Sequence, residues 1–119
     1  MNIEDYRTYC LSKNGTTESL PFPKLQNVLV FKVGNKIFTA TDINTFSSFS
    51  IKCHPETIEQ LRAEYPAMQE PSYFSKKHWS NVILDGSISD ELLYEWIDIS
   101  YELVVSKFTK KEKLRLENQ

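Results

Sequence analysis

The sequence predicts a two-layer α/β fold of the α+β type, in which an antiparallel sheet carries its helices on one face. Three kinds of segment support this. Strand-like apolar runs, helix-like apolar spacing and turn residues follow one another in the order α-β-β-β-α-β-β-α. This order implies a mostly antiparallel sheet. The 119 residues, of which 40% are hydrophobic, suffice for a single domain over residues 1–119.

The first three elements are a helix and a hairpin. Asn2 can cap a helix whose apolar positions include Tyr6 and Cys10, and Asn14-Gly15 supplies a stop. Residues 19–23 hold two prolines and are expected to be extended. The clearest local signal is at residues 27–41, where two β-branched and aromatic runs flank Gly34-Asn35, a two-residue hairpin turn.

The middle of the chain alternates a strand, a helix and a second strand pair. Apolar and polar residues alternate at 49–53, which predicts a third strand. His54-Pro55 is expected to start a helix that ends at Tyr65-Pro66. The next segment is expected to be a loop, then a short strand near Tyr73-Phe74 and a longer one from Trp79 to Leu84.

The last third of the chain is expected to be helical. Ser89 can cap a long helix that reaches about Lys107, and Thr109 with Glu112 resembles a capping box for a short helix in a basic tail at about 108–119. The long helix is expected to bury one stripe. Three aromatic residues are predicted to anchor the core: Trp79, Trp96 and Tyr101.

Composition restricts the class of protein. The formal net charge is −2, so the whole molecule has no long-range attraction for nucleic acid or anionic lipid. Neither a long apolar run nor a signal peptide is visible, which favours a cytoplasmic protein without a membrane partner. The two cysteines, Cys10 and Cys53, lack metal-ligand spacing and are expected to be free buried thiols.

The sequence predicts neither catalysis nor a cofactor. The available nucleophiles and bases are Ser100, Tyr101, His54, His78 and the two cysteines. None lies in a nucleophile elbow, a phosphate loop or an HExxH helix. No spacing of ligands predicts a metal site. We therefore expect a binding protein and not an enzyme.

Five segments carry a resemblance to a known family. They are LPFP (20–23), FKVGNKIF (31–38), IKCHPETIEQLRAEYP (51–66), KKHWSNVILDG (76–86) and LLYEWIDISYELVVSKFTKK (92–111). In this order they resemble the MmcQ/YjbR family of small bacterial cytosolic proteins. The resemblance implies a two-layer fold likened to CyaY-type bacterial frataxin and to type III secretion chaperones, and members are described as carrying a "double wing" DNA-binding motif.

A wing is a β-hairpin whose cations meet DNA phosphates, and this chain offers three groups of candidates. Lys32 and Lys36 flank the first turn, while the second strand pair contributes a cluster at its entrance. The full set of candidate nucleic-acid contacts is Lys32, Lys36, Lys76, Lys77, His78, Lys110 and Lys111. Binding through them is expected to be weak or non-specific, because the sequence has no recognition-helix signature.

Three other interpretations stay open. The lysines can be the solvated side of a one-sided sheet. The chain can be a protein-interaction or chaperone-like module, monomeric or weakly dimeric, with an aromatic patch in residues 65–74. A frataxin-like metal role is the third, although the acidic residues form no dense ridge.

Overall fold

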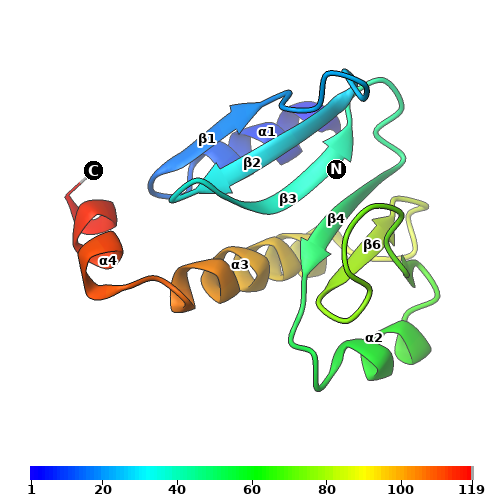
Figure 1. Ribbon diagram of the computed structural model, residues 1–119. Coiled ribbons are helices and arrows are strands. Elements are labelled where there is room, and N and C mark those ends of the chain that lie inside the picture. Colours follow the sequence, from blue (N-terminus) through cyan, green and yellow to red (C-terminus); the bar gives the residue numbers. More distant parts are fainter. Residues whose placement is uncertain (119) are drawn as a thin grey trace.

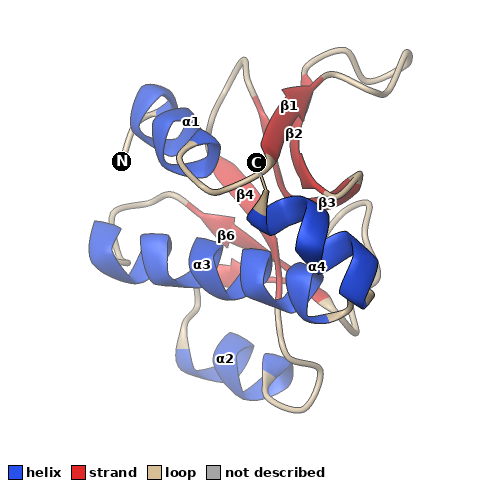
Figure 2. Cartoon of the chain, turned by 90° about the vertical axis from the view of Figure 1, so that its left-hand side faces the viewer, coloured by secondary structure: helices blue, strands red, loops and turns tan. Residues whose placement is uncertain are grey.

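The computed structural model of the protein describes residues 1–118, which form one six-stranded sheet and four helices. In chain order they are α1 (Ile3–Leu11), β1 (Thr16–Ser19), β2 (Val28–Val33), β3 (Lys36–Asp42), β4 (Ser48–Lys52), α2 (Ile58–Glu64), β5 (Met68–Gln69), β6 (Trp79–Ile83), α3 (Asp90–Ser106) and α4 (Lys110–Glu117). The strand order is β1-β2-β3-β4-β6-β5 and every pairing is antiparallel. Helices α1, α3 and α4 lie on the same side of the sheet (Figures 1 and 2). The predicted two-layer α+β architecture is confirmed.

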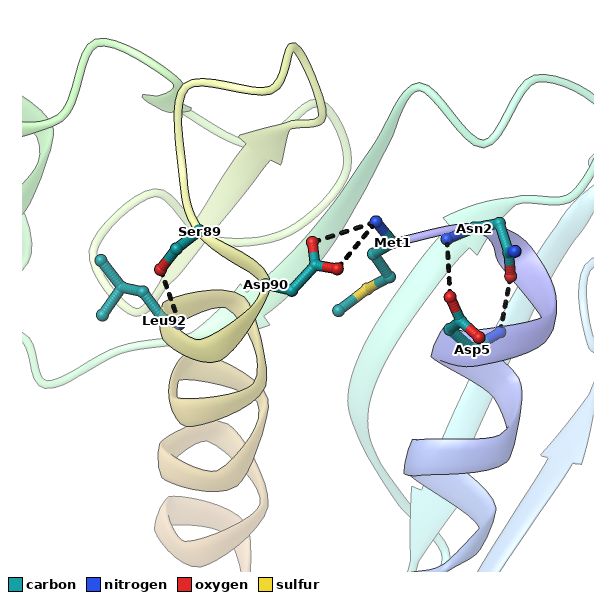
Figure 3. Close-up of polar contacts among 6 residues, drawn as sticks. All are labelled: Met1, Asn2, Asp5, Ser89, Asp90 and Leu92. Carbon is teal, nitrogen blue, oxygen red and sulfur yellow. Dashed lines mark hydrogen bonds and ion pairs between the residues drawn. The ribbon is translucent and has the colours of Figure 1, made fainter.

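Helices α1 and α3 begin side by side, and their predicted caps are present (Figure 3). The Asn2 side chain accepts a hydrogen bond from the Asp5 N–H (2.8 Å), and the Asp5 carboxylate accepts one from the Asn2 N–H (3.4 Å). Ser89 accepts from the Leu92 N–H (3.2 Å). Each cap satisfies N–H groups that have no partner within their own helix.

Tyr6 is the centre of the core between α1 and the sheet. Its ring contacts those of Phe31, Phe46 and Phe49, with centroids 5.2–5.3 Å apart. Its hydroxyl shares a 2.8 Å hydrogen bond with the Thr39 hydroxyl. Burial raises the pKa of Tyr6 well above its usual value. A fully buried phenol is thereby kept neutral and hydrogen-bonded.

A β-bulge in the first hairpin changes which side chains face the helices. Phe31 pairs with Thr39 and Lys32 with Ile37, which leaves Phe38 unpaired. Phe38 is fully buried and packs edge-on against Tyr101. Both Phe38 and its neighbour Thr39 therefore contribute to the core, which interrupts the usual alternation of a strand.

Ser100 joins the long helix to the sheet where β3 and β4 separate. The regular β3–β4 pairing ends at Thr39 and Ile51. Beyond it, the fully buried Ser100 hydroxyl donates to the Phe38 carbonyl and accepts from the Lys52 N–H (2.8 Å). One side chain thus satisfies a main-chain acceptor and a main-chain donor that would otherwise be buried without partners.

The tip of the first hairpin packs against the end of α3. Gly34 and Asn35 have φ values of +55° and +65°, which makes the turn type I′. A Cβ atom built on Gly34 would lie 2.4 Å from the ring of Phe108. Glycine at position 34 is therefore required both by the turn and by the close approach of this ring.

Two strands differ from the prediction. Strand β1 was not predicted, because its sequence TTES has no apolar face; it is an edge strand whose Glu18 forms an ion pair with Arg7 of α1 (2.6 Å). A short strand was expected near Tyr73-Phe74. The strand lies earlier in the chain instead, as β5, in a segment that was expected to be a loop. Met68 of β5 is buried whereas Tyr73 is exposed, so the strand forms where a side chain packs into the core.

Two further predictions need correction. Helix α2 begins at Ile58, since Pro55 lies in a preceding turn. Trp79 is half-buried and lies outside the core cluster, on the sheet face opposite the helices. Trp96, in contrast, is buried on α3, and Tyr101 packs at the edge of the core.

Replacing Ser100 by alanine should lower the free energy of unfolding. It leaves the Phe38 carbonyl and the Lys52 N–H without partners, which should cost about 2–4 kcal/mol in a urea titration. Ser106→Ala is the matched control on the same helix, because that exposed hydroxyl donates only to the Leu103 carbonyl. Ser106→Ala should lower the free energy of unfolding by no more than about 0.5 kcal/mol. Equal losses in the two variants would contradict the bridging role.

The turn glycines provide a second test. Gly34→Ala should be more destabilising than Gly86→Ala, because both positions have positive φ but a Cβ at Gly86 meets nothing within 4 Å. The backbone cost of about 1–2 kcal/mol is common to both. Crowding against Phe108 should add about 1–3 kcal/mol to the first only. If thermal unfolding shows the same loss of stability in both variants, the Phe108 ring does not restrict the turn.

Candidate nucleic-acid interface

The sheet face opposite α1 and α3, called here the open face, carries a row of cationic and aromatic side chains. Pairing across the strands places Lys32 beside Ile37 and Lys52 beside Trp79. Lys32 and Lys52 each have core residues as immediate neighbours along the strand. Their own side chains therefore point away from the helices. The open face at this end of the sheet therefore has two lysines and an indole.

Trp79 belongs to an aromatic stack that crosses the open face. Phe74 lies in the loop between β5 and β6, and its ring is stacked on that of Trp79 with centroids 4.3 Å apart and planes inclined by 18°. Both rings are half-buried, whereas the adjacent Tyr73 is 72% exposed. The loop thus presents a free aromatic ring beside the strands.

Lys76 and Lys77 are exposed in the turn that leads into β6, and Arg62 of α2 holds this turn. The Arg62 guanidinium donates to the carbonyls of Lys76 (2.7 Å) and Trp79 (2.6 Å) and to the Ser80 hydroxyl (3.2 Å). Its Nε and one terminal nitrogen are thus bound to protein groups. The two lysines are positioned at the end of the sheet, near Lys52.

His78 continues the β4–β6 ladder by one residue. Its carbonyl accepts from the Cys53 N–H (2.8 Å), and its own N–H donates to the Ser75 carbonyl (3.2 Å). The residue is half-buried. Its main chain is therefore structural, and its side chain is less accessible than those of the two lysines before it.

The remaining predicted cations lie on the helix side. Lys36 pairs with Val33, a core residue, and its Nζ is 5.7 Å from the centre of the Phe108 ring. Lys110 and Lys111 are exposed in the first turn of α4. The structure therefore separates Lys36, Lys110 and Lys111 from the open face, and the hairpin tip is not a free wing.

Glu112 of α4 lies close enough to this second group to interact with Lys36. Its pKa is lowered, chiefly by the hydrogen bond from the Thr109 N–H and to a smaller extent by Lys36 and Arg115. The cations around the hairpin tip are thus partly balanced by a carboxylate of the capping box.

The open-face cations, in contrast, are not paired within residues 1–118. The ion pairs in this part of the chain join Met1 to Asp90, Arg7 to Glu18 and Lys13 to Asp98. The acidic residues of the long helix lie in the other layer: Asp90, Glu91, Glu95, Asp98 and Glu102. The sheet therefore lies between the open-face lysines and the acidic residues of α3.

Two hollows flank this region. One, about 130 Å³, lies on the open face over Ser50 and Asn81. The other, about 330 Å³, lies between α2, α3 and the end of β4 and includes Cys53. Burial raises the pKa of the Cys53 thiol, with a smaller opposing effect of its hydrogen bond to Ser80. Both cysteines are buried and free, as predicted.

Sequence reasoning brought together Lys76, Lys77 and His78, and it missed Lys52, Ser50 and Asn81 as members of one surface. The missing signal is the β4–β6 register, which aligns residues about 30 positions apart in the chain. The alternation at 49–53 placed Lys52 opposite the core, but it could not supply the partner strand.

The structure defines a class: a small α+β protein with one helical layer and one open, partly basic sheet face. The sequence profile of the YjbR family matches residues 11–103, so the chain belongs to the YjbR family. No helix within residues 1–118 has the length and hydrophobicity needed to cross a bilayer.

The relatives agree with this assignment. The chain is 28% identical over 114 residues to "Uncharacterized protein YjbR" of Escherichia coli, covering 95% of each chain, and 31% identical to "Uncharacterized protein YbdF" of the same species over 73% of this chain and 72% of that one. The crystal structure of Deinococcus radiodurans protein DR2400 is similar, with a TM-score of 0.90 and 36% identity over 98% of this chain and 88% of that one. A Pseudomonas syringae protein shares the fold at a TM-score of 0.72 and 23% identity, over 87% of this chain and 98% of that one.

Arg62→Gln should loosen the turn that carries Lys76 and Lys77. Loss of the bonds to two carbonyls should increase amide hydrogen exchange at Cys53 and Trp79 and should cost about 1–3 kcal/mol of stability. Arg115→Gln is the control, because Arg115 is exposed on α4. Exchange at Cys53 and Trp79 that is unchanged in Arg62→Gln would contradict the clamp.

Proposed function

We propose that the protein binds nucleic acid through the open face of its sheet, with Lys32, Lys52, Lys76 and Lys77 contacting phosphates. The observation that carries the proposal is the placement of these cations. Lys32 and Lys52 lie on the open face, and Lys76 and Lys77 are exposed in the turn at its end. All four are unpaired within residues 1–118, and the sheet lies between Lys32 and Lys52 and the acidic α3. A polyanion on this face is thereby kept away from the carboxylates of α3.

Binding of this kind is driven mainly by charge. Four phosphate contacts on duplex DNA correspond to a slope of about −3 to −4 in a plot of log K against log salt concentration. No helix enters a groove in this arrangement, since the open face carries strands and loops only. Sequence preference for a duplex should accordingly be low.

A protein partner is the second candidate. Its supporting observation is the exposure of large apolar side chains, of which Tyr73 at 72% and Leu114 at 58% are the most exposed. These two lie on a loop over the open face and on α4, on opposite sides of the sheet, so one flat partner surface does not cover both. This separation makes the phosphate-binding proposal the better supported of the two.

Fluorescence anisotropy with a labelled DNA duplex, titrated at several salt concentrations, tests the proposal. Lys76→Gln/Lys77→Gln should reduce the magnitude of the salt slope by about 2, and Lys52→Gln should reduce it by about 1. Thr8→Glu is the matched control for Lys52→Gln. It makes the same change in net charge, but at an exposed position of α1. It should leave the slope unchanged.

Two results would contradict the proposal. One is the absence of binding at low salt by a protein whose circular dichroism spectrum is native. The other is an equal effect of Thr8→Glu and Lys52→Gln, which would mean that only net charge matters.

A further inference from the structure

The hollow on the open face has a floor of small side chains. Ala40, Ser50 and Asn81 are aligned across β3, β4 and β6, because Ala40 pairs with Ser50 and Ser50 with Asn81. Loop residues around Leu25 and Tyr73 form its walls. Ala40 is buried, but Ser50 and Asn81 are partly exposed, so the floor presents these two polar side chains to a flat group.

The floor also offers polar groups to a ligand. Ser48 and Ser50 use their main-chain carbonyls to accept from Thr41 and Thr39 (2.7 Å each), while their hydroxyls line the hollow together with the Asn81 amide. Hydroxyl and amide groups can each donate and accept. This set suits a heterocycle with both donors and acceptors at its edge.

The wall adds an aromatic surface. Tyr73 lines the hollow and is 72% exposed, and its neighbour Phe74 is held in place by its stack on Trp79. An exposed tyrosine ring can stack on a planar ligand and supply a large apolar contact area. Base stacking on such rings is a common way in which sheets bind single-stranded nucleic acid.

Charge gives the hollow a direction. Lys52 is two residues from Ser50 on the same side of β4, about 7 Å away along the strand. At the opposite end, the Asp42 carboxylate lines the hollow and accepts hydrogen bonds from the Asn27 side chain (2.6 Å) and the Asn44 N–H (2.8 Å). A phosphate is favoured at the lysine end and disfavoured at the aspartate end.

The size of the hollow limits what it can hold. Its volume of about 130 Å³ is below the roughly 300–1,000 Å³ of pockets that enclose a whole drug-sized ligand. One ring system fits, with the rest of the ligand outside.

We propose that this hollow holds one base of a single-stranded nucleic acid, stacked on Tyr73, with the adjoining phosphate at Lys52. The inference rests on the proposed function and names its ligand class, since a base inside an intact duplex is not available for stacking on a side chain. The Ser50 hydroxyl and the Asn81 amide contact the edge of the base. Lys32, Lys76 and Lys77 then meet phosphates farther along the strand.

Anisotropy titrations with four labelled oligonucleotides test this proposal: a short DNA single strand, the same sequence as RNA, its duplex, and an abasic strand that keeps the phosphates but lacks bases. The single strands should bind at least about tenfold more tightly than the abasic strand, because each stacked base contributes substantially to affinity. The tighter of DNA and RNA identifies the natural source of the strand.

Variants of the wall and floor locate the base. Tyr73→Ala should weaken single-strand binding about tenfold, whereas Tyr73→Phe keeps the ring and should bind as the native protein does. Ser50→Val should narrow the hollow and remove the hydroxyl, and so weaken single-strand binding to a similar extent. Neither change should affect the abasic strand.

The outcomes separate this inference from the function on which it rests. Equal binding of the abasic strand and the single strands, or of Tyr73→Ala and Tyr73→Phe, would overturn the base site and leave phosphate binding intact. No binding of any oligonucleotide at low salt would overturn both and would assign the open face to a protein partner.

Discussion

The structure depends on a single buried hydroxyl at the point where the sheet divides. Ser100 of α3 donates to the Phe38 carbonyl of β3 and accepts from the Lys52 N–H of β4. Both main-chain groups lie beyond the last β3–β4 pair, where burial without a partner would be costly. The bond therefore lets the strands diverge while the long helix stays fixed to both. Helical spacing places Ser100 on the buried stripe of α3, and the two bonds show what its hydroxyl does there.

The same constraint determines what the open face can offer. Next to the Phe38 bulge, Lys32 and Ile37 form one pair, and the main chain held by Ser100 orients Lys52 away from the core. Trp79 follows from the β4–β6 register. Helices cover the other face, and the sheet separates the acidic residues of α3 from Lys32 and Lys52. A two-layer α+β protein of the YjbR family thus has one face free to bind a polyanion, without any groove-reading helix.

The sequence predicted the elements whose signals are local. The Gly34-Asn35 turn and the caps at Asn2 and Ser89 each act within a few residues, and all three are present. It did not predict β1, a polar edge strand, because its stability comes from pairing with β2 and not from an apolar face. Nor could it orient Trp79: residues 79–84 have apolar side chains on both alternating sets, and a one-residue change of register would exchange the faces. Of the candidate site, the sequence predicted only residues that are consecutive in the chain, such as Lys76 and Lys77. Ser50 and Asn81 were missed because they are brought together by long-range strand pairing.

The most direct test of the account is to map backbone amide chemical shifts of the labelled protein during titration with a short single-stranded oligonucleotide. Open-face binding predicts the largest changes at Lys32, Lys52, Trp79 and Asn81, and at Tyr73 in the loop above them. Amides on the exposed side of α1 and α3 should hardly change, because the sheet separates them from the ligand. Changes concentrated on those helices, or around Leu114 on α4, would contradict the assignment of function to the open face.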